Sequence, residues 1–328
     1  MLPIKIRDQK GFNEVGLEIV DTLYTYVSSI CRLGYYTIEC YETIDGKRKL
    51  QHKNIYVHDD SKPFFEKINK ISTIKNLIFM PAHKLPKIIE LVDSSINIEA
   101  YVRGDIYSLF VDVLYSKRLQ KGKLIDSIGL QTCPYCNRGY IYTIKSGNIN
   151  PQIDHFYPKA LYPLFAVSLY NLIPSCSVCN SAGCKGSKDT LKENKYRLTS
   201  PYLLKHEDFH FNYKLLSPEI IKGEYTGEEI EVVLDHCAYE SHDRIFHIRE
   251  LYKKHDDHIV EMLYKRKYIY TDDYLKSLLE ITKSKISKTV VNQFIVGNFI
   301  EKDDYHKRPL SKMYTEIARE IGLIEKDI

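Results

Sequence analysis

The 328-residue sequence contains no tryptophan and only four methionines, and it has no marked excess of charge of either sign. Its 47 basic and 43 acidic residues leave a formal net charge of +4, so the overall composition does not indicate a polyanion-binding protein. No segment approaches the roughly 18 consecutive apolar residues of a membrane-spanning helix. The first twelve residues include charges at positions 5, 7 and 8 and lack the apolar centre of a secretory signal. We therefore expect a soluble, cytoplasmic protein without a membrane partner.

Motifs of two large enzyme classes are also missing. The sequence has no phosphate-binding loop of the GxxxxGK[ST] type and no GxSxG motif, so it predicts neither an NTPase nor a serine hydrolase. Its length is that of one large domain or of two to three small ones, and with 44% apolar residues it can bury a substantial core.

The first region, residues 1–125, is predicted to be mainly helical with one hairpin. Apolar residues recur at three- and four-residue steps, and proline stands near the start of two of the segments. An alternating stretch with Asp45-Gly46 at its middle predicts a β-hairpin. The predicted helices cover 16–33, 61–71, 85–92 and 98–119, and the predicted hairpin covers 35–57.

The second region, residues 126–200, contains five of the eight cysteines, and the third, residues 201–328, is again mainly helical. Within the second, residues 138–156 predict two short strands around Ser146-Gly147-Asn148, and a helix is expected to begin near Ser177. In the third, a hairpin comes first. Its predicted strands are 209–216 and 229–236, and the helices predicted after it are 244–270, 272–281 and 311–324.

Two Cys-x-x-Cys pairs frame the second region. Thiols stay reduced in the cytoplasm, so the cysteines do not by default predict disulfides. Four thiolates in two such pairs match a closed tetrahedral zinc site, which would be structural because it leaves no position for a substrate. A redox role for one pair is the competing interpretation. The four expected zinc ligands are Cys133, Cys136, Cys176 and Cys179, with Cys184 as an alternative to Cys179.

Polar residues with catalytic chemistry lie between these cysteine pairs. Asp154 and His155 follow one another at the end of a predicted strand, where successive side chains point to opposite faces. Asn171 follows them, and Asn180 comes directly after the last cysteine of the second pair. Residues 133–200 also hold eight lysines or arginines against three acidic residues, an excess of five that suits a phosphate backbone or a solvated, lysine-rich loop.

The segments CPYC, IDHFYPK and YNLIPSCSVCN together resemble the HNH endonuclease family, and in particular its subgroup with a four-cysteine zinc site. The resemblance implies an α+β, predominantly helical protein with a central ββα-metal element. It also implies that His155 is the general base, that Asp154 and Asn180 bind a catalytic Mg²⁺ or Mn²⁺, and that Asn171 holds the loop after the histidine. The implied substrate is nucleic acid, with DNA as the expected form.

This sequence departs from the family pattern after Asn180. Many members have Lys-Gly soon after the Cys-Asn pair, whereas here NSAGCKGSK places the first lysine five residues later. Lys185 and Lys188 are therefore both candidates for a phosphate contact, and the sequence does not choose between them. Arg138 and Lys159 are further candidates that are equally compatible with solvated surface charges.

The sequence favours one biological role and leaves two alternatives open. The C-terminal segment FHIRELYKKHDD resembles HNH proteins that act beside an ATPase in anti-phage systems such as Septu and some retrons, and we expect such a defence role with an ATPase partner. One alternative is a stand-alone restriction-type nuclease, and another is a non-catalytic zinc module that binds nucleic acid or protein.

A second histidine cluster, His236, His242 and His247, lacks a cysteine pair and predicts no second metal site.

Overall fold

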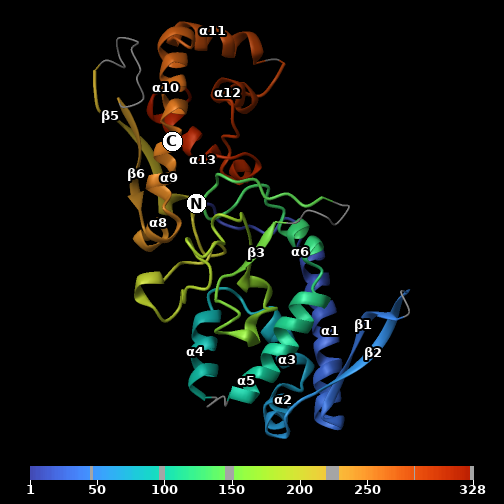
Figure 1. Ribbon diagram of the computed structural model, residues 1–328. Coiled ribbons are helices and arrows are strands. Elements are labelled where there is room, and N and C mark those ends of the chain that lie inside the picture. The colour runs from blue at the N-terminus through green and yellow to red at the C-terminus, as the bar shows by residue number, and fades with distance from the viewer. Residues whose placement is uncertain (45–46, 96–99, 145–150, 219–228, 284, 326–328) are drawn as a thin grey trace.

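The computed structural model describes residues 1–44, 47–95, 100–144, 151–218, 229–283 and 285–325. Within these ranges the fold is mixed α/β, with about half of the residues in helices. Figure 1 shows the N-terminal helices gathered in the lower half, the C-terminal elements in the upper half, and the cysteine-bearing segment between them. Among the described residues, none of the helices is both long enough and apolar enough to cross a bilayer.

Helix α1 organises the N-terminal region. The Asp8 side chain accepts a hydrogen bond from the Gly11 N–H at its start, and Gly34 ends it in the left-handed conformation with φ 79°. Its apolar face packs against α3, α6 and strand β1. The helices of this region are α1 (Gln9–Leu33), α2 (Lys62–Ile68), α3 (Ile71–Ile78), α4 (Leu85–Ser95), α5 (Ala100–Tyr107), a π-helix (Ser108–Arg118) and α6 (Lys121–Ile128), with one 3-10 turn (Asp59–Ser61).

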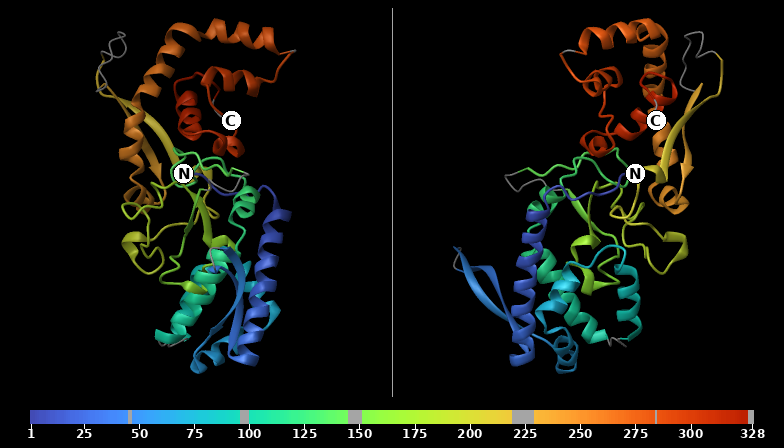
Figure 2. Two further views of the ribbon diagram at one scale, coloured as in Figure 1. Left: turned by 45° about the vertical axis from the view of Figure 1, so that its right-hand side comes forward. Right: turned by 180° about the vertical axis from the view of Figure 1, so that it is seen from behind.

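The predicted hairpin is present. β1 (Tyr35–Ile44) pairs with β2 (Lys47–Tyr56) antiparallel, with Tyr35 opposite Tyr56, and the predicted turn at Asp45-Gly46 lies outside the described residues. Figure 2 shows this hairpin projecting from the side of α1. Helix α6 was not predicted from the sequence.

The cysteine-bearing region differs from the prediction in two ways. Strand β3 (Gln152–His155) pairs with β4 (Leu172–Ser175), so its partner lies after the histidine and not before Ser146. Before it, the described residues up to 144 contribute only an isolated bridge between Thr132 and Tyr140. The helix expected near Ser177 is replaced by turns. Gly186 has φ 46°, and a Cβ there would lie 2.9 Å from the Ala182 Cα, so this tight turn requires glycine.

The C-terminal region begins with the second predicted hairpin, β5 (Phe209–Leu215) paired with β6 (Ile230–Cys237). The helix predicted over 244–270 is divided into shorter pieces, and α12 was not predicted. The helices are α8 (Glu240–Phe246), α9 (Ile248–Tyr252), α10 (Asp256–Tyr264), a π-helix (Lys265–Ile269), α11 (Asp272–Thr282), α12 (Lys288–Val296) and α13 (Ser311–Glu320). Shorter 3-10 segments are Pro163–Phe165, Leu169–Asn171, Asn194–Tyr196, His206–Asp208, Lys253–His255 and Lys302–Lys307.

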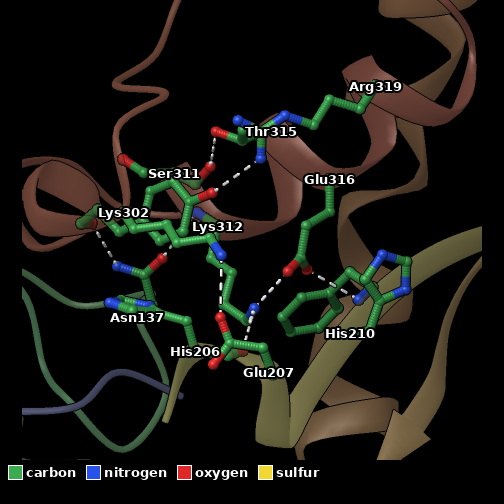
Figure 3. Close-up of polar contacts among 12 residues, drawn as sticks. Asn137, His206, Glu207, His210, Lys302, Ser311, Lys312, Thr315, Glu316 and Arg319 are labelled. Carbon is green, nitrogen blue, oxygen red and sulfur yellow. Dashed lines mark hydrogen bonds and ion pairs between the residues drawn. The ribbon is translucent and has the colours of Figure 1, made fainter. Parts of the chain in front are cut away.

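Asn137, which follows the first cysteine pair, contacts the C-terminal region, and Figure 3 draws it together with Ser311 and Lys312 of α13. The Asn137 side-chain amide donates to the backbone carbonyl of Tyr305 at 3.1 Å, and the Asn137 backbone carbonyl accepts from the Leu310 N–H at 2.6 Å. The Lys312 backbone N–H donates to the Asn137 side-chain oxygen at 3.3 Å, and the Lys312 side chain, 1% exposed, pairs with Glu316 within α13. Since these groups are buried, their contacts hold the two regions in one fixed arrangement.

Candidate metal centre and reaction site

The four cysteines of the two Cys-x-x-Cys pairs meet in one cluster. The sulfur atoms of Cys133, Cys136, Cys176 and Cys179 all lie within 4.8 Å of one another. Backbone N–H groups point at two of these sulfurs, from Arg138 to Cys136 and from Cys179 to Cys176. Cys184 is buried close by in sequence but does not belong to this cluster.

The chemistry of this cluster fits zinc. Burial raises the pKa of the Cys133 thiol well above its ordinary value, whereas the hydrogen bond with Cys133 lowers the pKa of the Cys136 thiol. A tightly bound divalent cation stabilises thiolates, and four sulfur ligands are those of a structural Zn²⁺ site. The cysteines could therefore hold zinc in the way the sequence predicted.

Strand β3 carries both Asp154 and His155. In the antiparallel register, Asp154 lies opposite Ile173 and His155 opposite Leu172, so the second, apolar strand fixes the pair in place. Both residues are buried, with 2% and 6% of their surfaces exposed.

The Asp154 carboxylate is held by two donors. The Tyr135 hydroxyl donates to Oδ2 at 2.6 Å, and the Lys185 ammonium donates to Oδ1 at 2.8 Å. The same ammonium also donates to the His155 backbone carbonyl at 2.6 Å. Lys185 is completely buried, so its charge serves the interior of the site and does not face solvent.

The His155 ring is oriented by its backbone contact and by Tyr115. Its Nε2 lies 3.0 Å from the Ala166 carbonyl, and because a carbonyl only accepts, Nε2 carries the proton of the neutral ring. Nδ1 is then an acceptor, and it has no hydrogen-bond partner within the described ranges. Burial, followed by the charge of Lys159, lowers the pKa of His155 to about 3, which keeps the ring neutral at physiological pH.

Asn171 is bonded to the loop that follows the histidine. Its side-chain oxygen accepts from the Tyr157 N–H at 2.8 Å, and its amide donates at 3.1 Å to the carbonyls of both Tyr157 and Phe165. The Asn171 carbonyl accepts from the Phe156 N–H at 2.9 Å. These four bonds fix the path of the chain from β3 to β4.

A cavity of about 460 Å³ brings Asp154, His155 and Asn180 together. The Asn180 amide donates to the Gln152 side chain at 2.9 Å, so its carbonyl oxygen is the group available to a cation. Tyr115 and Lys121, from the N-terminal region, line the same cavity. No sequence pattern identified them, since they come from an element remote in the chain from β3.

The four basic candidates lie in different surroundings. Lys159 lines the cavity, whereas Lys185 is enclosed beneath Asp154. Lys188 donates to the carbonyls of Ala182 and Cys184. The Arg138 Nε lies 3.0 Å from the Nε2 of His255, on the side of the C-terminal region.

The second histidine cluster is not gathered into a metal site. His242 is buried, with its Nε2 2.9 Å from the Thr199 carbonyl, whereas His236 is exposed. Over the described residues, the four cysteines form the one group of three or more His, Cys, Asp or Glu side chains close enough to share a metal ion.

Two curated proteins are similar to parts of this chain. The Septu protein PtuB of Bacillus thuringiensis is 32% identical over 106 residues, which cover 26% of this chain and 40% of that protein. Protein ea31 of Escherichia phage lambda is 32% identical over 131 residues, or 37% of this chain and 40% of its own length. The chain thus spans about 40% of the length of either relative. No family model matches the chain, and no solved structure matches it.

Proposed function

We propose that this protein is a metal-dependent endonuclease of the HNH type. The observation that carries the proposal is that Asp154 and His155, on strand β3, line one cavity together with Asn180, which lies in the turns after β4 next to the four-cysteine cluster. A zinc site alone explains the cysteines. It does not explain a buried carboxylate and a neutral histidine that face the same cavity.

The residues at the cavity fit a hard divalent cation. Each Asp154 oxygen has one protein donor, and a carboxylate offers about four lone-pair sites, so both oxygens retain the capacity for a cation. The Asn180 carbonyl oxygen would be the second protein ligand. Two oxygen ligands leave most of the coordination sphere to water and phosphate, as Mg²⁺ and Mn²⁺ prefer. When bound, the cation would neutralise the charge that develops on the leaving oxygen.

His155 would accept the proton of the attacking water at Nδ1. The hydrogen bond from Nε2 to the Ala166 carbonyl fixes the tautomer in which Nδ1 is unprotonated. A phosphodiester in the cavity would bring negative charge beside Lys159 and the ring, which counteracts the lysine charge that lowers the histidine pKa. Asn171 would keep the loop rigid, so that the imidazole stays aligned with the cavity.

We further propose that the nuclease is an effector of anti-phage defence that works with a partner ATPase. Support for this role comes from the similarity to the Septu protein PtuB and from the absence of an NTPase motif in the sequence given. The similarity covers a minority of each protein, so the site chemistry carries the enzymatic proposal and the relative supports only its setting.

Cleavage of nucleic acid by the purified protein tests the proposal. Plasmid, linear duplex, single-stranded DNA and RNA are incubated with Mg²⁺, Mn²⁺ or EDTA, with and without the proteins encoded beside it. We expect metal-dependent cleavage that His155→Ala abolishes while its circular dichroism spectrum remains that of a folded protein. His236→Ala, which changes an exposed histidine, is the matched control and should cleave normally.

The outcomes separate the alternatives. Cleavage that needs no partner would favour a stand-alone nuclease. Binding of nucleic acid without cleavage under any of these conditions would refute the enzymatic proposal and leave the non-catalytic zinc module.

A further inference from the structure

The Tyr115 ring holds two lysines of different regions. The Lys121 ammonium lies 4.2 Å from the ring centroid and the Lys159 ammonium 4.4 Å from it. The ring also makes an edge contact with His155, at 4.4 Å between centroids, and its hydroxyl donates to the Ile153 carbonyl at 3.4 Å. A single aromatic side chain therefore positions two cations beside the proposed base.

Neither ammonium forms a direct ion pair or hydrogen bond within the described ranges. Both lysines are half-buried, and the Asp112 carboxylate acts on Lys159 only from beyond ion-pair distance. Burial, which is the larger cause, and the charge of Lys121 both lower the pKa of Lys159; burial lowers that of Lys121. Two partly desolvated charges of like sign repel each other, and an anion bound between them would relieve that repulsion.

The cavity beside these lysines has the matching charge. Asp154 is its one acidic lining residue among those described, and that charge is already offset by the buried Lys185. Lys121 and Lys159 therefore leave the cavity with an excess of positive charge. An anion seated there would lie next to His155 and the Asp154 carboxylate.

We propose that Tyr115, Lys121 and Lys159 form a binding site for a phosphate group of the nucleic-acid backbone, beside the bond to be cleaved. This inference rests on the proposed nuclease function and gives the N-terminal helical region a direct part in substrate binding. Lys159 follows the histidine on the central element, whereas Lys121 begins helix α6, so the site is complete only when both regions are in place.

Binding measured without catalysis tests this site. A fluorescein-labelled single-stranded oligonucleotide and a duplex are titrated with the protein in buffer without Mg²⁺ or Mn²⁺, and anisotropy is followed from 50 to 300 mM salt. Lys121→Ala, Lys159→Ala and Tyr115→Leu are compared with wild type. Lys117→Ala, an exposed lysine on the preceding π-helix, is the matched control, and Lys121→Arg should retain binding.

Each lost phosphate contact should weaken binding on the order of fivefold at 0.1 M salt. The slope of log K against log salt should fall by about 0.7 for the single strand and 0.9 for the duplex per lysine removed. Tyr115→Phe, which keeps the ring, should bind like wild type, whereas Tyr115→Leu should weaken binding. Lys117→Ala should leave both the affinity and the slope unchanged.

Unchanged affinity and salt slope for both Lys121→Ala and Lys159→Ala, in variants with wild-type melting temperatures, would overturn the proposal. Binding of inorganic phosphate or a free nucleotide to the protein, without any lysine-dependent binding of the oligonucleotides, would overturn the assignment to a backbone phosphate. Because these assays contain no Mg²⁺ or Mn²⁺, a protein that binds in the predicted manner but never cleaves when these ions are added would contradict the nuclease proposal alone.

Discussion

The buried ion pair between Lys185 and Asp154 makes the sharpest stability prediction. Lys185→Met keeps most of the side-chain volume and removes the charge. The ammonium donates at 2.8 Å to Asp154 and at 2.6 Å to the His155 carbonyl, and the two paired side chains are 0% and 3% exposed. In the variant, the carboxylate would keep the Tyr135 hydroxyl as its donor while remaining out of water.

Removing one partner of a buried ion pair typically costs about 3–5 kcal/mol, because the remaining charge stays buried without compensation. Two lost hydrogen bonds from a charged donor, at about 1.5–3 kcal/mol each, sum to about 3–6 kcal/mol, which overlaps this range. We therefore expect the free energy of unfolding of Lys185→Met to fall by about 4 kcal/mol. Urea denaturation followed by circular dichroism measures this difference.

Two further variants isolate the cause. Lys188→Met removes a nearby lysine that pairs with no carboxylate in the described part of the chain. Its ammonium donates to two backbone carbonyls and lies 5.8 Å from the Tyr196 ring centroid, so the change should cost less than about 1 kcal/mol. Adding Asp154→Asn to Lys185→Met removes the unpaired charge, so the double variant should be more stable than Lys185→Met alone. A loss below about 1 kcal/mol for Lys185→Met, or no recovery in the double variant, would refute the assignment of this contact as a buried charge pair.

Three shorter predictions concern other parts of the molecule. Wild type should contain about one tightly bound zinc per chain by elemental analysis, which Cys136→Ser loses and Cys184→Ser keeps; equal zinc in all three would contradict the cluster. Asn171→Ala, which removes three buried side-chain bonds, should lower the free energy of unfolding by about 3 kcal/mol in urea, whereas Asn180→Ala, with one exposed bond, should change it by less than about 1 kcal/mol. Burial lowers the pKa of His242 to about 4, so the unfolded chain binds its proton first and stability falls as the pH drops from 6.5 toward 4. Between pH 7 and 5.5 this histidine should contribute about 1 kcal/mol to the loss; His242→Gln should show a flatter profile than His236→Gln, and identical profiles would contradict the prediction.

Local patterns predicted much of the fold. Helix α1 and the hairpins β1–β2 and β5–β6 are confirmed because each depends on periodicity and turn residues within one short segment. The partner predicted for β3, a strand before Ser146, was wrong, because β3 pairs with β4 instead. This pairing joins segments separated by an aromatic loop, and Leu172–Ser175 has no alternating pattern that would have predicted it. The helix expected near Ser177 was wrong because the chain turns repeatedly there, with a left-handed glycine at Gly186.

The candidate site likewise has some features that local sequence patterns predicted and others that they did not. The cysteine spacing pointed to one metal cluster, and the four sulfurs do converge. The role of Lys185 could not be predicted from spacing, because it depends on a fold that turns the lysine inward onto Asp154. Tyr115 and Lys121 were missed for a related reason. They approach the cavity through packing of a distant helical region, and no sequence motif records that approach.

The bonds of Asn137 have a consequence for how this protein could be divided or recombined. This residue follows the first cysteine pair directly, yet its partners include Tyr305, Leu310 and Lys312 at the other end of the sequence. A fragment limited to residues 126–200 would expose those polar groups and lose the Tyr252 hydroxyl, which donates to the Cys136 carbonyl at 2.7 Å. The central element therefore depends on the C-terminal region for its structure. A chimera that transplants it into another protein would have to carry the C-terminal helices as well.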